Sequence, residues 1–332
     1  MVTNVNTLSN SSSKFAGQFL MAIVVCILLM PSVHAGSATT LGDRFTNVDS
    51  ISNTRHNMTQ STAPLIVTSM NNFRNNYGEV CVYCHTPHGA NQTIAAPLWN
   101  RTIKVTNYQT YDELGTTTLT QAVMSTPGPA SLTCLSCHDG QTAIGSIINM
   151  PGSGSAGATG AQIQAQQTTQ NTAFLNLWSN LPTGGEATLH MGLNSTNGLL
   201  GNGTGSDFRG CLTCHSDTGA LSGGGPDFSM FNIGTDLRND HPVGITFPTT
   251  NGPGTDWNTP AGVKGSSNYF DKNSNGRMEK AEIRTYDGKV ECASCHDPHG
   301  VPSAGAGSVF NKTFLRVQNT NGSAVCFTCH VK

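Results

Sequence analysis

The chain has 332 residues, with 17 Lys or Arg against 19 Asp or Glu, so its formal net charge is −2 and it lacks the basic footprint of a nucleic-acid-binding protein. Glycine is frequent, with 37 residues, and only 36% of the residues are hydrophobic. An ordinary apolar core could not order ~300 residues of this composition, so we expect a group other than polypeptide to supply part of the buried surface.

The first predicted element is an export signal over residues 1–35. Residues 19–30 form the apolar run "FLMAIVVCILLM", and the following "PSVHA" offers a small-residue cleavage site after Ala35. The run is too short to remain as a membrane span. Its removal takes Cys26 and His34 out of the mature chain. We therefore expect a secreted protein, extracellular or at the cell surface, without a membrane span; the periplasm is the alternative.

Every cysteine after the signal belongs to a Cys-x-x-Cys-His unit. Two thiols at this spacing can each form a thioether to one haem, while the adjacent histidine binds the iron from the proximal side. Disulfides or zinc sites are the alternatives in an exported protein, but neither requires a histidine after every second cysteine. We predict five covalently bound haem c groups. The units are Cys81, Cys84 and His85; Cys134, Cys137 and His138; Cys211, Cys214 and His215; Cys292, Cys295 and His296; Cys326, Cys329 and His330.

These units divide the mature chain into three segments. Residues 36–140 carry the first two haem units, 141–260 form a glycine-rich middle with the third, and 261–332 carry the last two. Stretches such as "PGSGSAGATGAQ" (151–162) predict loops, because glycine weakens helices and strands alike. Short helices are expected at the attachment sites and around 172–180. The predicted fold is a multihaem cytochrome c, mostly coil with short helices and few strands, wrapped around a stacked haem chain.

The second axial ligand of each iron decides the chemistry. Electron-transfer haems have both axial positions filled by protein, whereas catalytic haems keep one open. Beyond the proximal histidines and His34, the sequence has one further histidine for each predicted haem. Methionine ligation is an alternative, with Met58, Met124 and Met191 as candidate donors. The count predicts bis-histidine ligation by five distal residues: His56, His88, His190, His241 and His299.

His88 and His299 each lie three residues after a proximal histidine, in "CHTPHG" and "CHDPHG". On a helix-like turn such a side chain stays on the same side of the haem as its neighbour. We therefore expect each of them to bind a different haem from the one beside it. For His299 we predict the nearest downstream site, Cys326 and Cys329.

Residues 271–282, "DKNSNGRMEKAE", match the twelve-residue calcium loop. Gly276 stands at the turn position, and oxygen donors stand at the ligand positions. A solvated polar turn is the alternative, since no entering helix is predicted before the loop. We predict one structural Ca²⁺ just ahead of the fourth haem unit. Its ligands would be Asp271, Asn273, Asn275, Arg277 through its backbone carbonyl, Glu279 and Glu282.

"TRHN" (54–57) ahead of "VCVYCHTPHGA" (80–90), and "NDHPVGI" (239–245) ahead of "CASCHDPHG" (292–300), resemble multihaem c-type cytochromes with doubled CXXCH motifs. More narrowly, they are similar to the extracellular, filament-forming (nanowire) cytochromes of metal-reducing microbes. The resemblance implies coil around stacked bis-histidine haems, with one axial histidine supplied by a neighbouring subunit. His56 is the histidine that we expect to act in trans in such a homopolymer.

The function implied is electron transfer without catalysis. Closely spaced haems would pass electrons, with other redox proteins as partners, toward an extracellular acceptor such as a metal oxide or another cell. A periplasmic multihaem carrier is the first alternative. A pentahaem reductase of the nitrite, hydroxylamine or tetrathionate type is the second, but it needs an open axial position, and the histidine count leaves none.

Overall fold

The computed structural model of the chain divides into two units, Met1–Thr40 and Leu41–Lys332. The first unit, with the predicted signal, lies outside the described residues, as do Cys211, Cys214, His215, His190 and the helix expected around 172–180. Within the described part, no helix is long and apolar enough to cross a membrane. The segments predicted within the second unit stay a prediction. The structure describes residues 48–58, 75–76, 79–103, 107–117, 119–140, 144, 147–149, 155–156, 212, 229–302, 313–319 and 322–331.

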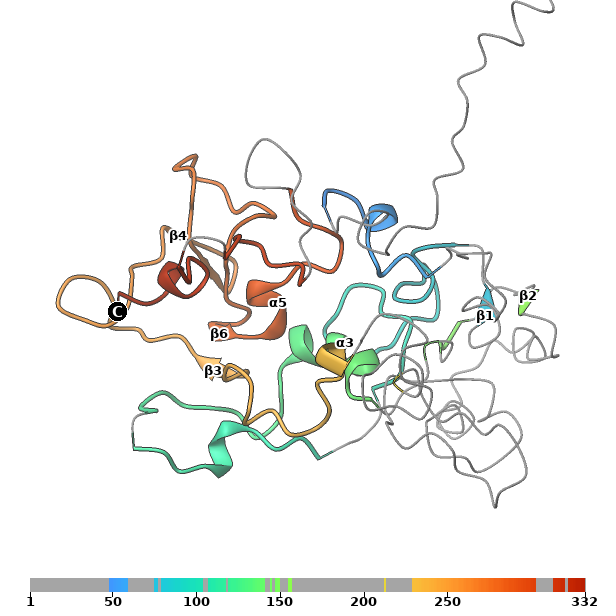
Figure 1. The fold of residues 1–332 in the computed structure, drawn as a ribbon, viewed down its shortest axis with the longest axis horizontal. Helices are drawn as coiled ribbons and strands as arrows, with labels where there is room; N and C mark the ends of the chain where they lie inside the picture. The colour runs from blue at the N-terminus through green and yellow to red at the C-terminus, as the bar shows by residue number, and fades with distance from the viewer. Residues whose placement is uncertain are drawn as a thin grey trace, which may run out of the picture. The chain divides into compact units, whose positions relative to one another are not determined.

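Regular structure is sparse and short in these residues, so the expectation of a mostly coil fold is confirmed (Figure 1). The helices are α3 (Pro129–His138) and α5 (Cys292–Cys295), with 3-10 turns η1 (Ile51–Asn53), η3 (Tyr111–Glu113), η7 (Ser229–Phe231) and η8 (Cys326–Thr328). The strands form three antiparallel pairs: β1 (Asn75–Asn76) with β2 (Ser155–Ala156), β3 (Ile245–Thr246) with β6 (Lys289–Val290), and β4 (Gly262–Lys264) with β5 (Ser267–Tyr269).

Three of the four described attachment units form the short helices expected there. The second unit ends α3, which starts with Pro129 in its first turn, where the missing N–H costs nothing. The fourth unit forms α5, and the fifth contains η8. The first unit is instead a hydrogen-bonded turn in which the Cys84 and His85 N–H groups donate to the carbonyl of Cys81. Each described unit thus places two thiols and a histidine along a short stretch of backbone.

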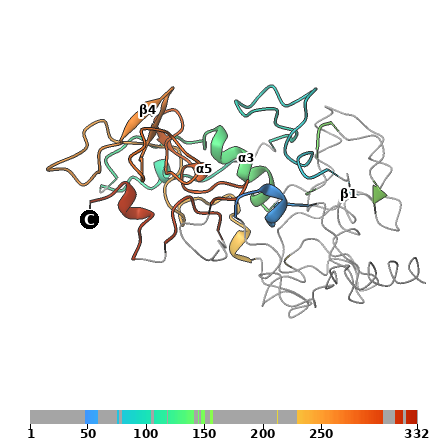
Figure 2. The same cartoon turned by 90° about the horizontal axis from the view of Figure 1, so that it is seen from above.

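Helices α3 and α5 lie side by side in both perpendicular views (Figures 1 and 2). The Ser131 hydroxyl of α3 accepts a 2.9 Å hydrogen bond from the backbone N–H of Cys292. The buried carboxylate of Glu291 accepts from the Gly128 N–H at the start of α3 and from the Ser131 hydroxyl. The second and fourth attachment units are therefore joined through their helix N-termini.

The apolar core of the described part is split into small clusters. One contains Tyr83, Ile147 and Ile148, a second Tyr108, Leu135 and Leu237, and a third Phe247, Phe270, Ile283 and Val317. Cysteines of the attachment units border them: Cys84 packs on the first cluster, and Cys295 and Cys329 on the third. Apolar side chains thus gather next to the predicted thioether positions.

Candidate haem-binding sites

The eight described cysteines of the attachment units are free thiols, and none forms a disulfide. Among the described residues, no three His, Cys, Asp or Glu side chains are grouped to hold one metal ion. Disulfides and zinc therefore find no support there. Burial raises the pKa of the Cys84 and Cys329 thiols to about 12 and that of Cys295 to about 11. These positions disfavour a charged thiolate, whereas an uncharged thioether suits them.

Six described histidines hold one ring nitrogen, Nδ1, against a backbone carbonyl or a carboxylate. A protonated Nδ1 donating in this way leaves Nε2 as an unprotonated lone pair, which is the form that binds a metal ion. This shared orientation fits a haem iron at each ring. The pairs are His56 with Pro298 (3.2 Å), His85 with Pro97 (2.9 Å), His138 with Phe231 (2.7 Å), His241 with Pro242 (3.0 Å), His296 with Thr313 (2.5 Å) and His299 with Asp297 (3.0 Å).

The predicted distal residue His56 lies beside the proximal residue His138 of the same chain. Their ring centres are 6.0 Å apart and their planes are inclined by 75°. Two imidazoles that bind one iron from opposite sides hold their ring centres about 6 Å apart, because each metal–nitrogen bond is about 2 Å long. Burial lowers the pKa of His56 to about 4, so its imidazole is neutral at pH 7. The spacing fits a shared iron, so ligation in cis is an alternative to the ligation in trans expected from the resemblance, and both stay predictions.

His299 lies beside His85, with ring centres 6.1 Å apart and planes inclined by 14°. This position fits the expectation that His299 binds a haem other than that of the adjacent His296. The neighbouring unit is the first one, however, and not the predicted unit of Cys326 and Cys329. The reason is the turn after His296: Gly300 adopts a left-handed φ of +84° and its N–H donates to the Asp297 carbonyl. The chain then runs to Val301, whose carbonyl accepts from Asp49, and away from the fifth unit.

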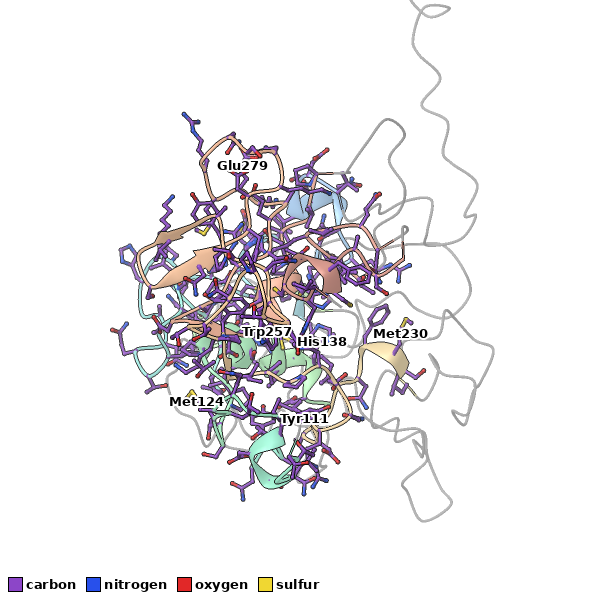
Figure 3. All side chains as sticks on the ribbon, turned by 90° about the vertical axis from the view of Figure 1, so that its left-hand side faces the viewer. Tyr111, Met124, His138, Met230, Trp257 and Glu279 are labelled. Carbon is purple, nitrogen blue, oxygen red and sulfur yellow. The ribbon has the colours of Figure 1, made fainter. Side chains whose placement is uncertain are left out.

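At the fifth unit, the described histidine nearest in electrostatic effect is His241. The charge of His241 contributes to the lowered pKa of His330, for which burial is the main cause. The ring of Trp257 packs 4.4 Å from that of His330, and the two residues form an isolated β-bridge. In Figure 3, Trp257 and His138 are labelled among densely packed side chains. Sequence reasoning missed Trp257, because no motif links it to a residue so far along the chain.

Four described histidines have no histidine counterpart of this kind: His88, His241, His296 and His330. In the described ranges, ring contacts between histidines join only His56 with His138 and His85 with His299, and His190 and His215 lie outside those ranges. His88 is exposed, and its backbone carbonyl accepts from Thr86 and Asn149. The assignment of His88, His190, His215, His241, His296 and His330 to axial pairs stays a prediction.

The candidate methionine ligands are placed as follows. Met58 is partly buried against the cluster of Tyr83, Ile147 and Ile148, and the Met124 side chain is 42% exposed. Met191 lies outside the described residues.

The cysteines of different units form a row. The neighbouring thiols of Cys134 and Cys292, where α3 meets α5, shift each other's pKa, raising that of Cys134 and lowering that of Cys292. Cys295 and Cys329 pack on the same cluster of Phe247, Phe270, Ile283 and Val317, and Cys295 adds to the burial that raises the pKa of Cys329. The charge of Cys137 likewise adds to the burial that raises the pKa of the Cys84 thiol. The described units therefore follow one another in the order first, second, fourth and fifth.

Buried Arg101 joins the first two units in this row. Its guanidinium donates to the carbonyl of Ser136, inside the second unit, and to that of Ile144. The neighbouring Asn100 N–H donates to the carbonyl of Cys84 in the first unit. The pair of residues thus holds both units to one short stretch of backbone.

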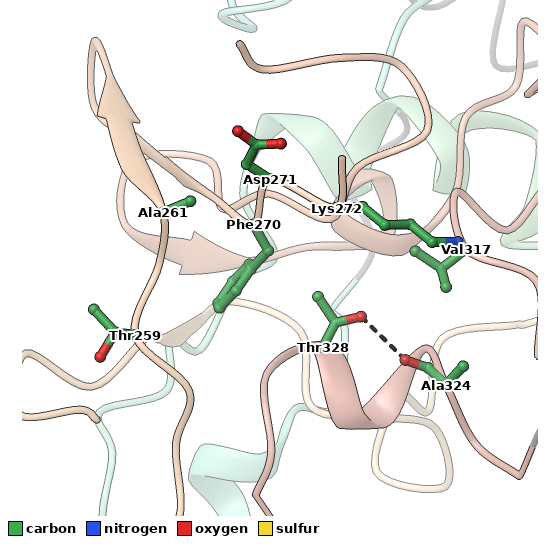
Figure 4. Close-up of a pocket in the computed structure, with 8 residues that line it drawn as sticks. All are labelled: Thr259, Ala261, Phe270, Asp271, Lys272, Val317, Ala324 and Thr328. Carbon is green, nitrogen blue, oxygen red and sulfur yellow. Dashed lines mark hydrogen bonds between the residues drawn. The ribbon is translucent and has the colours of Figure 1, made fainter. Parts of the chain in front are cut away.

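A pocket of about 330 Å³ opens beside η8 (Figure 4). Phe270 and Val317 give it an apolar wall, Thr328 of η8 borders it, and Lys272 adds a cation. Such a wall next to Cys329 suits the face of a porphyrin, and a lysine suits its carboxylates. The residues present therefore fit a haem at the fifth unit.

The predicted calcium loop is closed by its own side chains. The Asp271 carboxylate accepts from the N–H groups of Asn273, Asn275 and Gly276, and Gly276 has the left-handed φ of +72° that its turn requires. Buried Glu282 accepts from the N–H groups of Lys272 and Glu279. Figure 3 shows Glu279 on a loop at the edge of the molecule. The backbone is wrapped as the motif predicts, but the acidic side chains are not grouped as a metal site, so calcium stays a prediction.

Comparison with known families agrees with the motifs. Residues 286–332, which contain β6, α5, η8 and the last two units, match the family model described as the doubled CXXCH motif. No curated protein matches the chain. The CXXCH motifs indicate covalently bound haem c. Together these findings are consistent with a multihaem c-type cytochrome, a kind of haem-binding protein that transfers electrons.

Proposed function

We propose that the chain carries five haems, each bound by two histidines, and conducts electrons between partners outside the cell. The observation that carries this proposal is the spacing of two histidine pairs, His56 with His138 and His85 with His299, whose ring centres are 6.0 and 6.1 Å apart. Each pair joins residues far apart in the sequence. Two such spacings support saturated axial ligation, which is the state of electron-transfer haems.

Haem supplies an iron that accepts and releases one electron, and the polypeptide supplies everything that directs this chemistry. The cysteines fix each site along the row. The carbonyls of Pro97, Phe231 and Pro298 orient imidazoles by holding Nδ1, so that each ring needs little rearrangement when the iron changes its oxidation state. Filling both axial positions with protein keeps small substrates away from the metal, which favours conduction over catalysis.

The row has exposed ends and a more covered middle. Cys81 of the first unit and Cys326 of the fifth are exposed, whereas the described cysteines of the second and fourth units are partly buried. Beside Cys326, the side chains of Phe327 and Val331 are 49% and 55% exposed. Electrons would therefore enter and leave at the first and fifth units, where another redox protein, a metal oxide or a cell surface could approach.

Export by the segment 1–35 and end-to-end polymerisation complete the proposal. The exposed ends of the row and the resemblance to filament-forming cytochromes support polymerisation. Because His56 already has a neighbour in its own chain, we expect the subunits to meet through exposed surface such as Phe327 and Val331. Electron microscopy of native surface material should show haem-containing filaments, and a soluble periplasmic monomer would contradict this part.

The central test is the spectrum of the mature chain made in a host that attaches haem c. Intact mass should give five haems, and optical and electron paramagnetic resonance spectra should show low-spin iron only. A substantial high-spin signal in the wild-type protein would reject saturated ligation and favour the reductase alternative. Turnover of nitrite, hydroxylamine or tetrathionate would then identify the substrate.

The loop 271–282 is proposed to bind one Ca²⁺ that stabilises the segment before the fourth unit. The support is the motif and the wrapped backbone around Asp271; small rotations of Glu279 and Glu282 would complete the ligand set. Calcium should raise the melting temperature, and Glu282→Gln should abolish that rise. Asp287→Asn removes a nearby carboxylate outside the loop and serves as the control. Equal melting temperatures in calcium and in chelator would refute the site.

A further inference from the structure

We infer that the buried Asp297–Arg316 pair acts through His299 to set the lowest reduction potential among the described haem sites, at the unit of Cys81 and Cys84. The inference rests on the proposed function, since it requires that His299 and His85 share an iron. Asp297, which directly follows the fourth attachment unit, would position the His299 ring and lower the reduction potential of the haem that this ring binds. One short stretch, residues 296–300, would thereby serve several haems.

The stretch touches three of the described sites. His296 is the proximal residue of its own unit, and His299 faces His85 of the first unit at 6.1 Å. The carbonyl of Pro298 holds Nδ1 of His56, which faces His138 of the second unit.

Asp297 is unlike the other groups that hold a histidine here. Its Oδ1 accepts from the backbone N–H of His299 and lies 3.0 Å from Nδ1 of the same residue. Its Oδ2 lies 3.1 Å from Nη1 of Arg316, and the two side chains are only 9% and 5% exposed. Arg316 is itself fixed by the carbonyls of Ala293 and Lys280. The carboxylate is therefore held in one position against His299.

The other five Nδ1 acceptors are uncharged backbone carbonyls. A carboxylate withdraws the Nδ1 proton more strongly and makes the imidazole a better electron donor to the iron. Its negative charge also stabilises the ferric form, which carries one more positive charge than the ferrous form. Both effects lower the reduction potential of that site. The first site would hold its electron least tightly and so mark the reducing end of the row.

The primary experiment is a potentiometric titration of the full haem-loaded protein with Asp297→Asn. Asparagine keeps an oxygen that can accept from His299 but removes the charge and leaves the charge of Arg316 unbalanced. We expect the midpoint potential of the first site to rise most, with a smaller rise at the fourth site, whose His296 precedes Asp297, while the low-spin spectrum stays unchanged. A low-spin protein with all potentials unchanged would overturn the inference. Asp236→Asn removes the same charge from a surface Asp236–Arg238 pair and should shift no potential.

The site is identified by repeating the titration without the first haem. In a Cys81→Ala and Cys84→Ala background, the largest shift caused by Asp297→Asn should vanish. A shift of the full size that persists there would place His299 on another haem and overturn the assignment.

His299→Met covers the case in which Asp297→Asn fails to fold, because it leaves the buried pair intact. A thioether ligand raises the potential of its haem, so one midpoint should rise strongly. Five unchanged potentials would exclude His299 as a ligand. The proposed function fails separately, if the wild-type protein itself lacks low-spin haems.

Discussion

Glu291 joins α3 to α5, and its removal should loosen the contact between the second and fourth units. The side chain is 3% exposed and accepts from the Gly128 N–H at 3.2 Å and from the Ser131 hydroxyl. Glu291→Ala leaves both donors without a partner, and each buried donor without a partner costs about 1–3 kcal/mol. Because Ser131 can turn to another acceptor, we expect a loss of about 2–4 kcal/mol in the free energy of unfolding.

Glu291→Gln is the matched comparison. Glutamine keeps one acceptor oxygen and removes the charge. Burial raises the pKa of Glu291, although the hydrogen bonds from Ser131 and Gly128 oppose this rise. The folded protein therefore already disfavours the charged form of this carboxyl group. The loss for Glu291→Gln should therefore be below about 1 kcal/mol.

The pH dependence follows from the same shift. Between the ordinary carboxyl pKa of 4.5 and the raised pKa of the folded state, the folded chain binds more protons than the unfolded chain. The contribution of Glu291 to stability is therefore full below that window and is lost as the pH rises through it. Glu291→Gln should lack this loss.

Guanidinium unfolding of the haem-loaded protein, followed by far-ultraviolet circular dichroism, measures these differences. Gly128→Ala offers an independent perturbation, since a methyl group there would collide with the Glu291 carboxylate and displace it. Alanine and glutamine variants of equal stability would refute the reasoning, because the cost would then not depend on the lost acceptor.

Three further changes test other parts of the structure. His56→Ala should remove the distal ligand of the second site. Electron paramagnetic resonance of the monomeric protein should then show one high-spin haem. A monomer with only low-spin haems would contradict the pairing of His56 with His138 in one chain. Arg101→Leu removes a fully buried guanidinium that donates to the carbonyls of Ile144 and Ser136. The free energy of unfolding, measured with guanidinium, should fall by about 2–4 kcal/mol. A fall below about 1 kcal/mol would contradict the role of Arg101 in joining the first two units. Gly276→Ala should cost only about 1 kcal/mol in thermal unfolding, because the left-handed φ of +72° strains alanine while the surrounding space is open; a much larger loss would indicate a contact that the structure lacks.

The haem attachment sites could be predicted from sequence because their chemistry is local. Cys292, Cys295 and His296 must follow one another closely to reach one haem, and Pro129 marks the start of the helix that carries the second unit. The mostly coil fold likewise follows from the high glycine content and the few apolar residues. These features depend on neighbours within a few positions.

The pairing of distal histidines could not be predicted, because it depends on how distant segments fold together. Spacing suggested that His299 would turn toward the nearest downstream unit. In the structure its ring lies 6.1 Å from that of His85, next to a turn at Gly300 and beside Asp297, which is held by Arg316. The carboxylate at 297 is visible in "CHDPHG", but only its burial beside Arg316 distinguishes it from a solvated aspartate.

Under the proposed ligation, the same pairs would explain how a chain with so few apolar residues can fold. The apolar clusters are small, yet His56 with His138 and His85 with His299 each bring together segments far apart in the sequence. A bond from each ring to one iron would close long loops, and the entropy lost by the unfolded chain rises only slowly with loop length. Such cross-links restrict the unfolded state much as disulfides do. Haem attachment should therefore be a condition for folding, since without it the six oriented imidazoles have nothing to join.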